Sequence, residues 1–286
     1  MTVPCFHVIL RDMFATLPSP PRKTTFRSLY RELELTRAAL RAFTKPLFSW
    51  RKALSTSLDG RTLYDFARRA PQNLDRLHRL LSREEFSFAE GLELKYALKS
   101  KHRAIYLFPW EDRIVDLLLF RLLNRHFSWA FSPSCHAYRH RGFGVDSCTG
   151  GAFRALRRLP RPVWLLKRDI ADYFSSVDHE RLLALLSQWV EPGDYLSRLL
   201  EERIRFRYRS GEAEVSSVAA RGIPFGTALA CFFANVYLTP LDFAVTRLPE
   251  THYFRYGDDL LLFTPDLGTA RAAALTLARG MQALRL

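Results

Sequence analysis

The feature that most constrains this chain is the tetrapeptide Tyr256-Gly257-Asp258-Asp259, set between two short apolar runs. The flanking runs, His252–Arg255 and Leu260–Phe263, are rich in aromatic and aliphatic residues. Two such runs around a Gly-Asp pair predict a β-hairpin with a tight turn. The turn would carry two adjacent carboxylates, with no lysine near them in the sequence. The turn is therefore either an ordinary Asp-rich hairpin turn or a site for an oxygen-preferring divalent cation, Mg²⁺ or Mn²⁺.

A third carboxylate follows another apolar run. Residues 163–166 have β character and lead to Asp169, where a strand end can hold a side chain rigidly. If this strand lies beside the hairpin, Asp169 converges with Asp258 and Asp259. Three carboxylates suffice to hold two Mg²⁺ ions about 3.5–4 Å apart. Taken alone, Asp169 could equally be a helix N-cap, a frequent role for aspartate after a strand.

The charge of the chain indicates a polyanionic partner. The 286 residues are 48% hydrophobic, which predicts one large domain or two subdomains. Lys and Arg number 43 against 29 acidic residues, a formal net charge of +14, and nucleic acid is the simplest partner for such an excess. Charge alone does not separate nucleic acid from an anionic membrane. No basic helix with a clean apolar face accompanies it, so we expect no membrane association.

The cysteines and the N-terminus favour a cytoplasmic location. The four cysteines are widely spaced, with no C-x-x-C pair, which favours a reducing compartment. His136 and His140 lie near two of them, but the spacing fits no zinc pattern. The N-terminus, with Arg11-Asp12, is a poor signal peptide. The uncharged run Gly222–Leu241 approaches the length of a membrane span, but its prolines predict a loop followed by a buried helix.

The order of periodic segments predicts a mixed α/β chain. Residues 1–25 look like a tail or linker, and the pattern is helical from about Phe26 to Leu98. A strand is predicted at Ala104–Pro109. Arg203–Arg209 alternates basic and apolar residues, which predicts a strand face able to contact phosphates. Further helices are predicted at residues 114–127, 182–190, 195–203, 227–241 and 269–284.

Several blocks in this order resemble reverse transcriptases, most closely the bacterial branch with group II intron, retron and defence-associated enzymes. The blocks are D-I-x-x-Y-F-S-S-V-D-H from Asp169, R-G-I-P-F-G-x-x-x-A-x-x-x-A-N-x-Y-L-x-x-L-D from Arg221 and F-R-Y-G-D-D from Phe254. Upstream, Arg103 with Pro109-x-Glu-Asp-Arg113, and then Ser132–Gly142, resemble two fingers blocks. The resemblance covers about residues 90–286, and ordered blocks together are far more specific than one motif.

The resemblance implies a right-hand palm-and-fingers fold, with an antiparallel palm sheet backed by helices. It assigns residues 91–160 to the fingers and residues 161–286 to an incomplete palm. The sequence pattern places a tail (1–25) and an N-terminal helical region (26–90) before them. A Lys-bearing palm segment, a primer-grip hairpin and a thumb would be expected next. We therefore expect a further C-terminal segment or a second polypeptide to supply the thumb.

The implied activity is RNA-directed DNA polymerisation with dNTPs, an RNA template and a DNA or RNA primer. It would serve a retroelement or antiphage defence. Two Mg²⁺ ions, or Mn²⁺, would be held by Asp169, Asp258 and Asp259, with the carbonyl of Ile170 as a further ligand. The alternative is a catalytically incomplete, reverse-transcriptase-like scaffold that binds nucleic acid.

The resemblance also implies a set of nucleotide contacts. Phe174 would lie under the sugar and exclude a 2′-hydroxyl, or else be a core aromatic, although Tyr173 suits the core better. Arg103 and Lys101 would grip the triphosphate, unless they form a solvated basic face. Tyr256 would approach the primer end, whereas Asn235 and Asp242 would be structural. The loop under the nucleotide would comprise Gly222, Pro224, Phe225 and Gly226. Phe225 stands where the family usually has glutamine, and Ala230-Cys231 replaces the usual Ser-Pro, so handling of the substrate is expected to be unusual.

Overall fold

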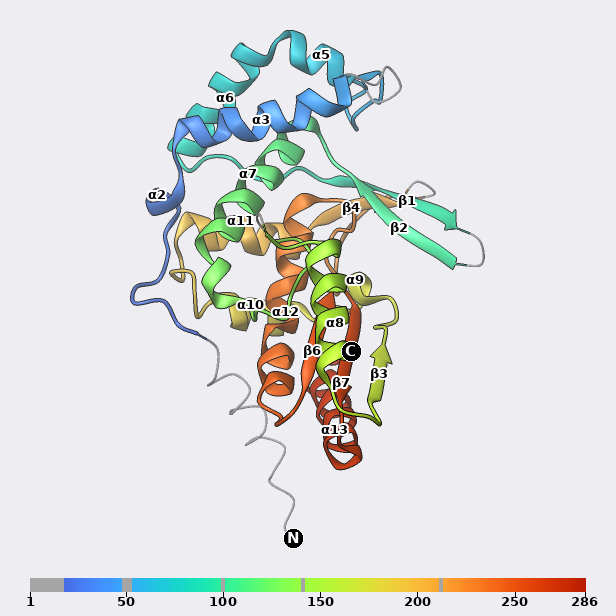
Figure 1. The fold of residues 1–286 in the computed structure, drawn as a ribbon. Helices are drawn as coiled ribbons and strands as arrows, with labels where there is room; N and C mark the ends of the chain where they lie inside the picture. Colours follow the sequence, from blue (N-terminus) through green and yellow to red (C-terminus); the bar gives the residue numbers. More distant parts are fainter. Residues whose placement is uncertain (1–17, 48–52, 99–100, 140–141, 211–212) are drawn as a thin grey trace. The chain divides into compact units, whose positions relative to one another are not determined.

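The computed structural model describes residues 18–47, 53–98, 101–139, 142–210 and 213–286 (Figure 1). Side chains are described for these residues except 44–47, 96–98, 101–103 and 213–215. Internal contacts divide the chain into two units, each built from separated stretches. The first, here termed the hairpin unit, comprises Met1–Pro21, Asn124–Gln188 and Phe232–Leu286. The second, termed the four-stranded unit, comprises Arg22–Leu123 and Trp189–Cys231.

The hairpin unit is built on a three-stranded antiparallel sheet in the order β3-β7-β6. Its strands are β3 (Trp164–Arg168), β6 (His252–Tyr256) and β7 (Asp259–Thr264). Helix α8 (Val145–Arg158) packs against β6, and α13 (Leu267–Ala283) packs against β3 and β7. The predicted hairpin, the strand before Asp169 and the antiparallel palm sheet backed by helices are therefore confirmed.

The core of the hairpin unit centres on α12 (Ala228–Thr246) from Phe232 onward. Phe233, Tyr237, Leu238 and Leu241 are all fully buried. A helix that is apolar on every side is stable in water only when it is surrounded by protein. By length and composition α12 could cross a membrane, but 78% of its apolar window is buried inside the protein. This agrees with the predicted loop followed by a buried helix.

Shorter helices complete the hairpin unit. They are the 3₁₀ turn η1 (Ser128–Ala130), α9 (Tyr173–Ser176) and α10 (His179–Leu186). Asp178 caps α10, because its side chain accepts a hydrogen bond from the backbone N–H of Arg181 at 3.1 Å. The predicted helix at 182–190 is thus shifted toward the N-terminus and ends at Leu186.

The four-stranded unit holds a mixed sheet in the order β2-β1-β4-β5. Its strands are β1 (Gly91–Leu98), β2 (Lys101–Leu107), β4 (Arg207–Ser210) and β5 (Ala213–Val218). Only β1 and β4 run parallel among these described strands. The helices are α2 (Phe26–Leu29), α3 (Glu32–Leu47), α5 (Leu63–Arg68), α6 (Ala70–Ser82), most of α7 (Trp110–His126) and α11 (Tyr195–Ile204).

The structure corrects two predictions for the N-terminal half. The helical pattern predicted as far as Leu98 is wrong for β1, where Gly91–Leu98 pairs with β2 as a hairpin. Apolar residues in β1 recur at every second position from Leu92, which is the period of a strand. Residues 1–17 of the predicted tail lie outside the described residues. Thr24, within that predicted tail, is buried and forms a β-bridge with Val190.

The third correction concerns the predicted basic face at Arg203–Arg209. Arg203 is fully buried in the last turn of α11. Its guanidinium lies 2.9 Å from Asp116 and 3.2 Å from Asp112. Only from Arg207 does the segment become a strand, and there Arg207 and Arg209 are exposed. Arg207 and Arg209 do form a basic strand face, but Arg203 is buried in ion pairs and does not belong to that face.

Candidate active site

The turn between β6 and β7 contains just two residues. Tyr256 pairs with Asp259, which leaves Gly257 and Asp258 as the central residues. Gly257 has a φ of +66°, a conformation that side chains other than glycine rarely adopt. Glycine at the first central position is the signature of a type II′ hairpin turn. The sequence therefore fixes a tight turn that presents Asp258 and Asp259 at one end of the sheet.

Asp169 reaches the same end of the sheet from the neighbouring strand. In the antiparallel pairing of β3 with β7, Arg168 lies opposite Leu260. Asp169 is the next residue after Arg168, and Asp259 is the residue before Leu260, so both leave the ladder at the same end. The alternative role of Asp169 as an N-cap is not observed, because the N-cap of α9 is Asp172.

The three carboxylates differ in exposure and in surroundings. Asp169 and Asp259 are exposed, and Asp258 is half-buried. Lys167 Nζ lies 3.9 Å from Asp259 Oδ1, so a lysine that is distant in the sequence approaches the turn in the fold. Lys167 belongs to β3, and only the pairing of the strands brings it near. Among the described residues, no three His, Cys, Asp or Glu side chains are gathered closely enough to hold a metal ion.

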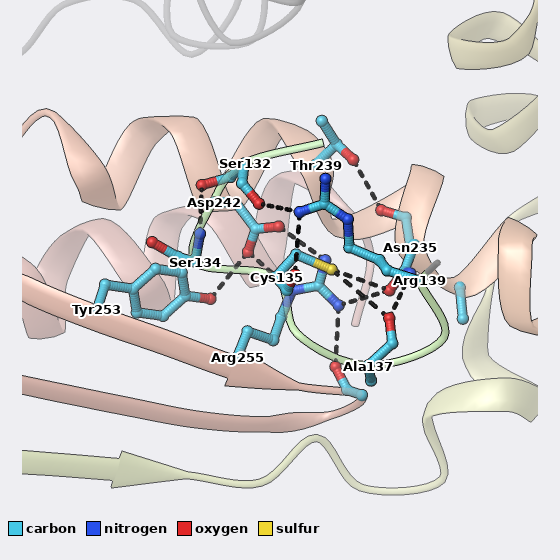
Figure 2. A network of polar contacts seen from close by, with 12 residues as sticks. Ser132, Ser134, Cys135, Ala137, Arg139, Asn235, Thr239, Asp242, Tyr253 and Arg255 are labelled. Carbon is cyan, nitrogen blue, oxygen red and sulfur yellow. Dashed lines mark hydrogen bonds and ion pairs between the residues drawn. The ribbon is translucent and has the colours of Figure 1, made fainter. Parts of the chain in front are cut away.

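A buried polar network lies beneath the turn (Figure 2). Arg255 and Asp242 are both fully buried and form a two-pronged ion pair, Nε to Oδ1 at 2.8 Å and Nη2 to Oδ2 at 2.7 Å. The hydroxyl of Tyr253 donates to the same Asp242 Oδ1 at 3.0 Å. The carboxylate raises the pKa of Arg255 well above its usual value despite burial, so the guanidinium stays charged.

The remaining nitrogen of Arg255 reaches the turn itself. Nη1 donates to Asn235 Oδ1 and to the carbonyl of Gly257, each at 3.1 Å. Asn235 and Asp242 are structural, as predicted, but the prediction overlooked Arg255. The sequence did contain a signal for this residue. Arg255 lies two residues after Tyr253 in a strand, so both side chains point to the same, buried face.

A loop that precedes α8 is tied to the same network. The backbone N–H of Arg255 donates to Ser134 O at 2.8 Å, and that of His136 donates to Arg255 O at 2.9 Å. The Asn235 amide donates to Ala137 O at 2.8 Å. Burial raises the pKa of the Cys135 thiol to about 11, so this thiol is unreactive at neutral pH. The three described cysteines are free thiols.

The two aromatic residues after Asp169 have separate environments. Tyr173 is buried, and its hydroxyl donates to Ala234 O at 2.6 Å. Phe174 is half-buried. Tyr173 is therefore the core residue of the pair, as expected, and the contact of Phe174 with a sugar stays a prediction.

The predicted nucleotide loop lies in the four-stranded unit. Gly222 and Gly226 have φ values of +87° and +102°, which explains the glycines at both positions. The loop runs along β2, where the N–H of Tyr106 donates to Phe225 O at 3.5 Å. A Cβ atom on Gly226 would lie 3.4 Å from Ile105. Thus the loop and the strand that carries Lys101 and Arg103 are neighbours, although the side chains of those two residues lie outside the described part.

Residues 94–285 match the protein family described as "Reverse transcriptase (RNA-dependent DNA polymerase)". The chain belongs to this reverse transcriptase family. It is also similar to a protein of Schizosaccharomyces pombe (strain 972 / ATCC 24843) described as "Uncharacterized 91 kDa protein in cob intron", with 23% identity over 176 residues. That match covers 61% of this chain and 21% of the relative, so it spans about a fifth of the relative's length.

The predicted site residues of this chain fall into two groups. The hairpin unit holds the three carboxylates together with Ile170, Phe174 and Tyr256, and the four-stranded unit holds Lys101, Arg103 and the loop Gly222–Gly226. Ile170 is buried directly after Asp169, and Tyr256 is half-buried at the end of β6. The roles of these residues as ligands or nucleotide contacts stay predictions.

Proposed function

We propose that this chain is an RNA-directed DNA polymerase that transfers nucleotides from dNTPs to the 3′-hydroxyl of a primer on an RNA template. The observation that carries the proposal is the position of the three carboxylates. Asp169, Asp258 and Asp259 leave one end of the β3-β7-β6 sheet on two neighbouring strands. Membership of the reverse transcriptase family supports the same reaction.

The proposed cofactors are two divalent cations, Mg²⁺ or Mn²⁺. Carboxylate oxygens are the donors that these ions prefer, and the carbonyl of Ile170 would add a further oxygen. When bound, such ions lower the pKa of the primer hydroxyl and stabilise the negative charge of the departing pyrophosphate. The chain itself would position the three carboxylates at the end of the β3-β7-β6 sheet, outside the buried core.

The remaining assignments concern substrate recognition. Phe174 would contact the sugar of the nucleotide, and Tyr256 would lie near the primer end. Arg103 and Lys101 would bind the triphosphate, with the loop Gly222–Gly226 below the base. We also propose a cytoplasmic location and a role in a retroelement or in antiphage defence.

The decisive experiment is primer extension on an RNA template with Mg²⁺ and dNTPs. We expect Asp258→Asn/Asp259→Asn to reduce incorporation at least about 100-fold, because each amide lacks the negative charge and one of the two oxygens that would hold the cations. Asp146→Asn removes an exposed carboxylate at the start of α8 and is the matched control. Incorporation that survives in the double variant would refute the proposal.

A second candidate function is a reverse-transcriptase-like scaffold that binds nucleic acid without catalysis. The observation that favours it is Phe225, which stands in a loop position where the family usually has glutamine. The same experiment separates the two. RNA binding without incorporation by either protein would favour the scaffold, whereas incorporation by the parent chain alone would exclude it.

A further inference from the structure

We propose that Arg255 is a positioning residue that holds the carboxylate turn in the geometry needed to bind divalent cations. The inference rests on the proposed function, since it assigns the same turn to the cations. It adds a residue that does not touch the substrate or the cations itself. Its basis is the hydrogen bond from Arg255 Nη1 to the carbonyl of Gly257.

That carbonyl has a special place in the turn. It belongs to the peptide unit that joins Gly257 to Asp258, so the hydrogen bond fixes the plane of the peptide directly before the first carboxylate. Gly257 adopts a left-handed φ that leaves the turn few conformations. The backbone of Arg255 is itself fixed on both sides, by Ser134 O and by the N–H of His136.

The guanidinium reaches three partners from one fully buried position. Two of its edges bind Asp242 and Asn235 (Figure 2). The same Nη1 that binds Asn235 also donates to the carbonyl of Gly257. Only a planar fork of donors can do this, because a lysine ammonium cannot pair with both carboxylate oxygens and also reach the turn. A buried ion pair is by itself weak evidence for stability. The hydrogen bond from Nη1 to the Gly257 carbonyl explains why residue 255 is an arginine.

The network also offers a matched control on the same strand. Tyr253 binds the same Asp242 Oδ1 as Arg255 does, at 3.0 Å, but none of its hydrogen bonds in the described structure reaches the turn. Tyr253→Phe therefore disturbs the buried network while leaving the contact with Gly257. Arg255→Lys keeps the positive charge and removes the contact.

The experiment measures Mn²⁺ binding to the whole chain by electron paramagnetic resonance, alongside kcat and KM for dNTP in primer extension. We expect Arg255→Lys to weaken Mn²⁺ binding and to lower kcat, each about tenfold or more, with KM for dNTP within about twofold of the parent. Tyr253→Phe should leave Mn²⁺ affinity within about twofold of the parent, even if it lowers the midpoint of thermal unfolding as much as Arg255→Lys does. Equal losses in both variants, or parental Mn²⁺ affinity in Arg255→Lys, would overturn the inference.

A second variant covers the case in which Arg255→Lys does not fold, as judged by circular dichroism. Asp242→Asn keeps the volume of the side chain and loosens the guanidinium. We expect it to weaken Mn²⁺ binding more than Tyr253→Phe does. Equal affinity in these two variants would overturn the inference.

The outcomes also separate this inference from the proposed function. A parent chain whose Mn²⁺ affinity depends on Arg255, but which does not extend primers, would support the inference and refute the polymerase. A parent that extends primers, with Arg255→Lys behaving like Tyr253→Phe, would refute the inference alone. A parent that neither binds Mn²⁺ nor extends primers would refute both.

Discussion

Single buried arginines organise the interior of both units. In the four-stranded unit, the guanidinium of Arg203 lies 3.8 Å and 4.1 Å from the ring centroids of Phe88 and Phe108. The single guanidinium of Arg203 pairs with two carboxylates, those of Asp112 and Asp116. Burial outweighs the attraction of Arg203 and raises the pKa of Asp112 to about 7 and that of Asp116 to about 6. The cluster therefore takes up protons in a range where exposed carboxylates stay ionised.

These raised pKa values predict how stability changes with pH. An unfolded aspartate has a pKa of about 3.9, so the folded state binds protons more tightly than the unfolded state. The free energy of unfolding should then fall as pH rises from about 4 to about 7 and level off above. We expect a loss of at least about 1 kcal/mol from this cluster between pH 5 and pH 7.5. Urea titrations at the two pH values measure it.

The variant Asp116→Asn tests the cause. It keeps the side-chain volume and removes one of the two carboxylates, so the pH-dependent loss should shrink by about half. Asp75→Asn is the control, because Asp75 and its partner Arg79 are both well exposed. An unchanged pH dependence in Asp116→Asn would show that the cluster does not titrate in this range.

A second prediction at this scale concerns Lys167. Its ammonium group lies 3.9 Å from Asp259 and partly neutralises the carboxylates. Lys167→Ala should therefore strengthen Mn²⁺ binding, by about twofold, since exposed charges interact weakly in water. Arg158→Ala, at the end of α8, is the control for lost positive charge. Weaker Mn²⁺ binding in Lys167→Ala would contradict this assignment of Asp259.

Among the elements, the packing of α8 on β6 depends on one glycine. A Cβ atom at Gly151 would lie 2.9 Å from the ring of Phe254, whereas one at Gly150 would come no closer than 3.5 Å to Arg154. Both glycines lie inside α8. The close approach of helix and strand therefore requires glycine only at Gly151.

Two alanine substitutions separate helix propensity from packing. Gly150→Ala should stabilise the protein by up to about 1 kcal/mol, the gain in helix propensity. Gly151→Ala gains the same amount, but overpacking typically costs about 1–3 kcal/mol, so it should be neutral or destabilising. Urea unfolding of the two variants gives the difference directly. Equal stabilisation by both variants would mean that the Phe254 ring moves away from the added methyl group without a cost in stability.

The elements with a regular hydrophobic period could be predicted from sequence. The β6–β7 hairpin, β3, α12 and α13 agree with the predictions, because one local pattern determines each. Gly91–Leu98 was wrongly predicted as helix, although its apolar residues recur at every second position from Leu92. Its identity as a strand depends on pairing with β2.

The candidate site was predictable in its carboxylates but not in its supports. Asp169, Asp258 and Asp259 stand out in the sequence, and their strands are neighbours. Lys167 and Arg255 act through contacts across strands or with α12, at a sequence distance of 92 residues for the Lys167–Asp259 pair. Arg203 belongs to the last turn of α11, although it continues the alternation of basic and apolar residues that precedes β4. Such contacts depend on tertiary packing, which no local period encodes.

For the whole molecule, the excess of positive charge is the property most directly tied to nucleic acid. The formal net charge of +14 predicts attraction to RNA at long range. Not every one of the 43 Lys and Arg residues can bind phosphate, since Arg203 and Arg255 are buried in ion pairs. On β4, by contrast, Arg207 and Arg209 are exposed, although Arg209 also pairs with Glu90 at 2.8 Å.

Salt titrations distinguish contact residues from general charge. The logarithm of the RNA association constant should fall linearly with the logarithm of salt concentration, with a slope of about 0.7 per phosphate contact on a single strand. If the β4 face binds RNA, Arg207→Ala should make that slope shallower by about 0.7. Arg79→Ala removes the same charge from α6, where Arg79 pairs with Asp75, and should change the slope much less than Arg207→Ala does. Equal slopes for Arg207→Ala and Arg79→Ala would mean that β4 contributes only to the long-range field, and that the phosphate contacts lie elsewhere on the chain.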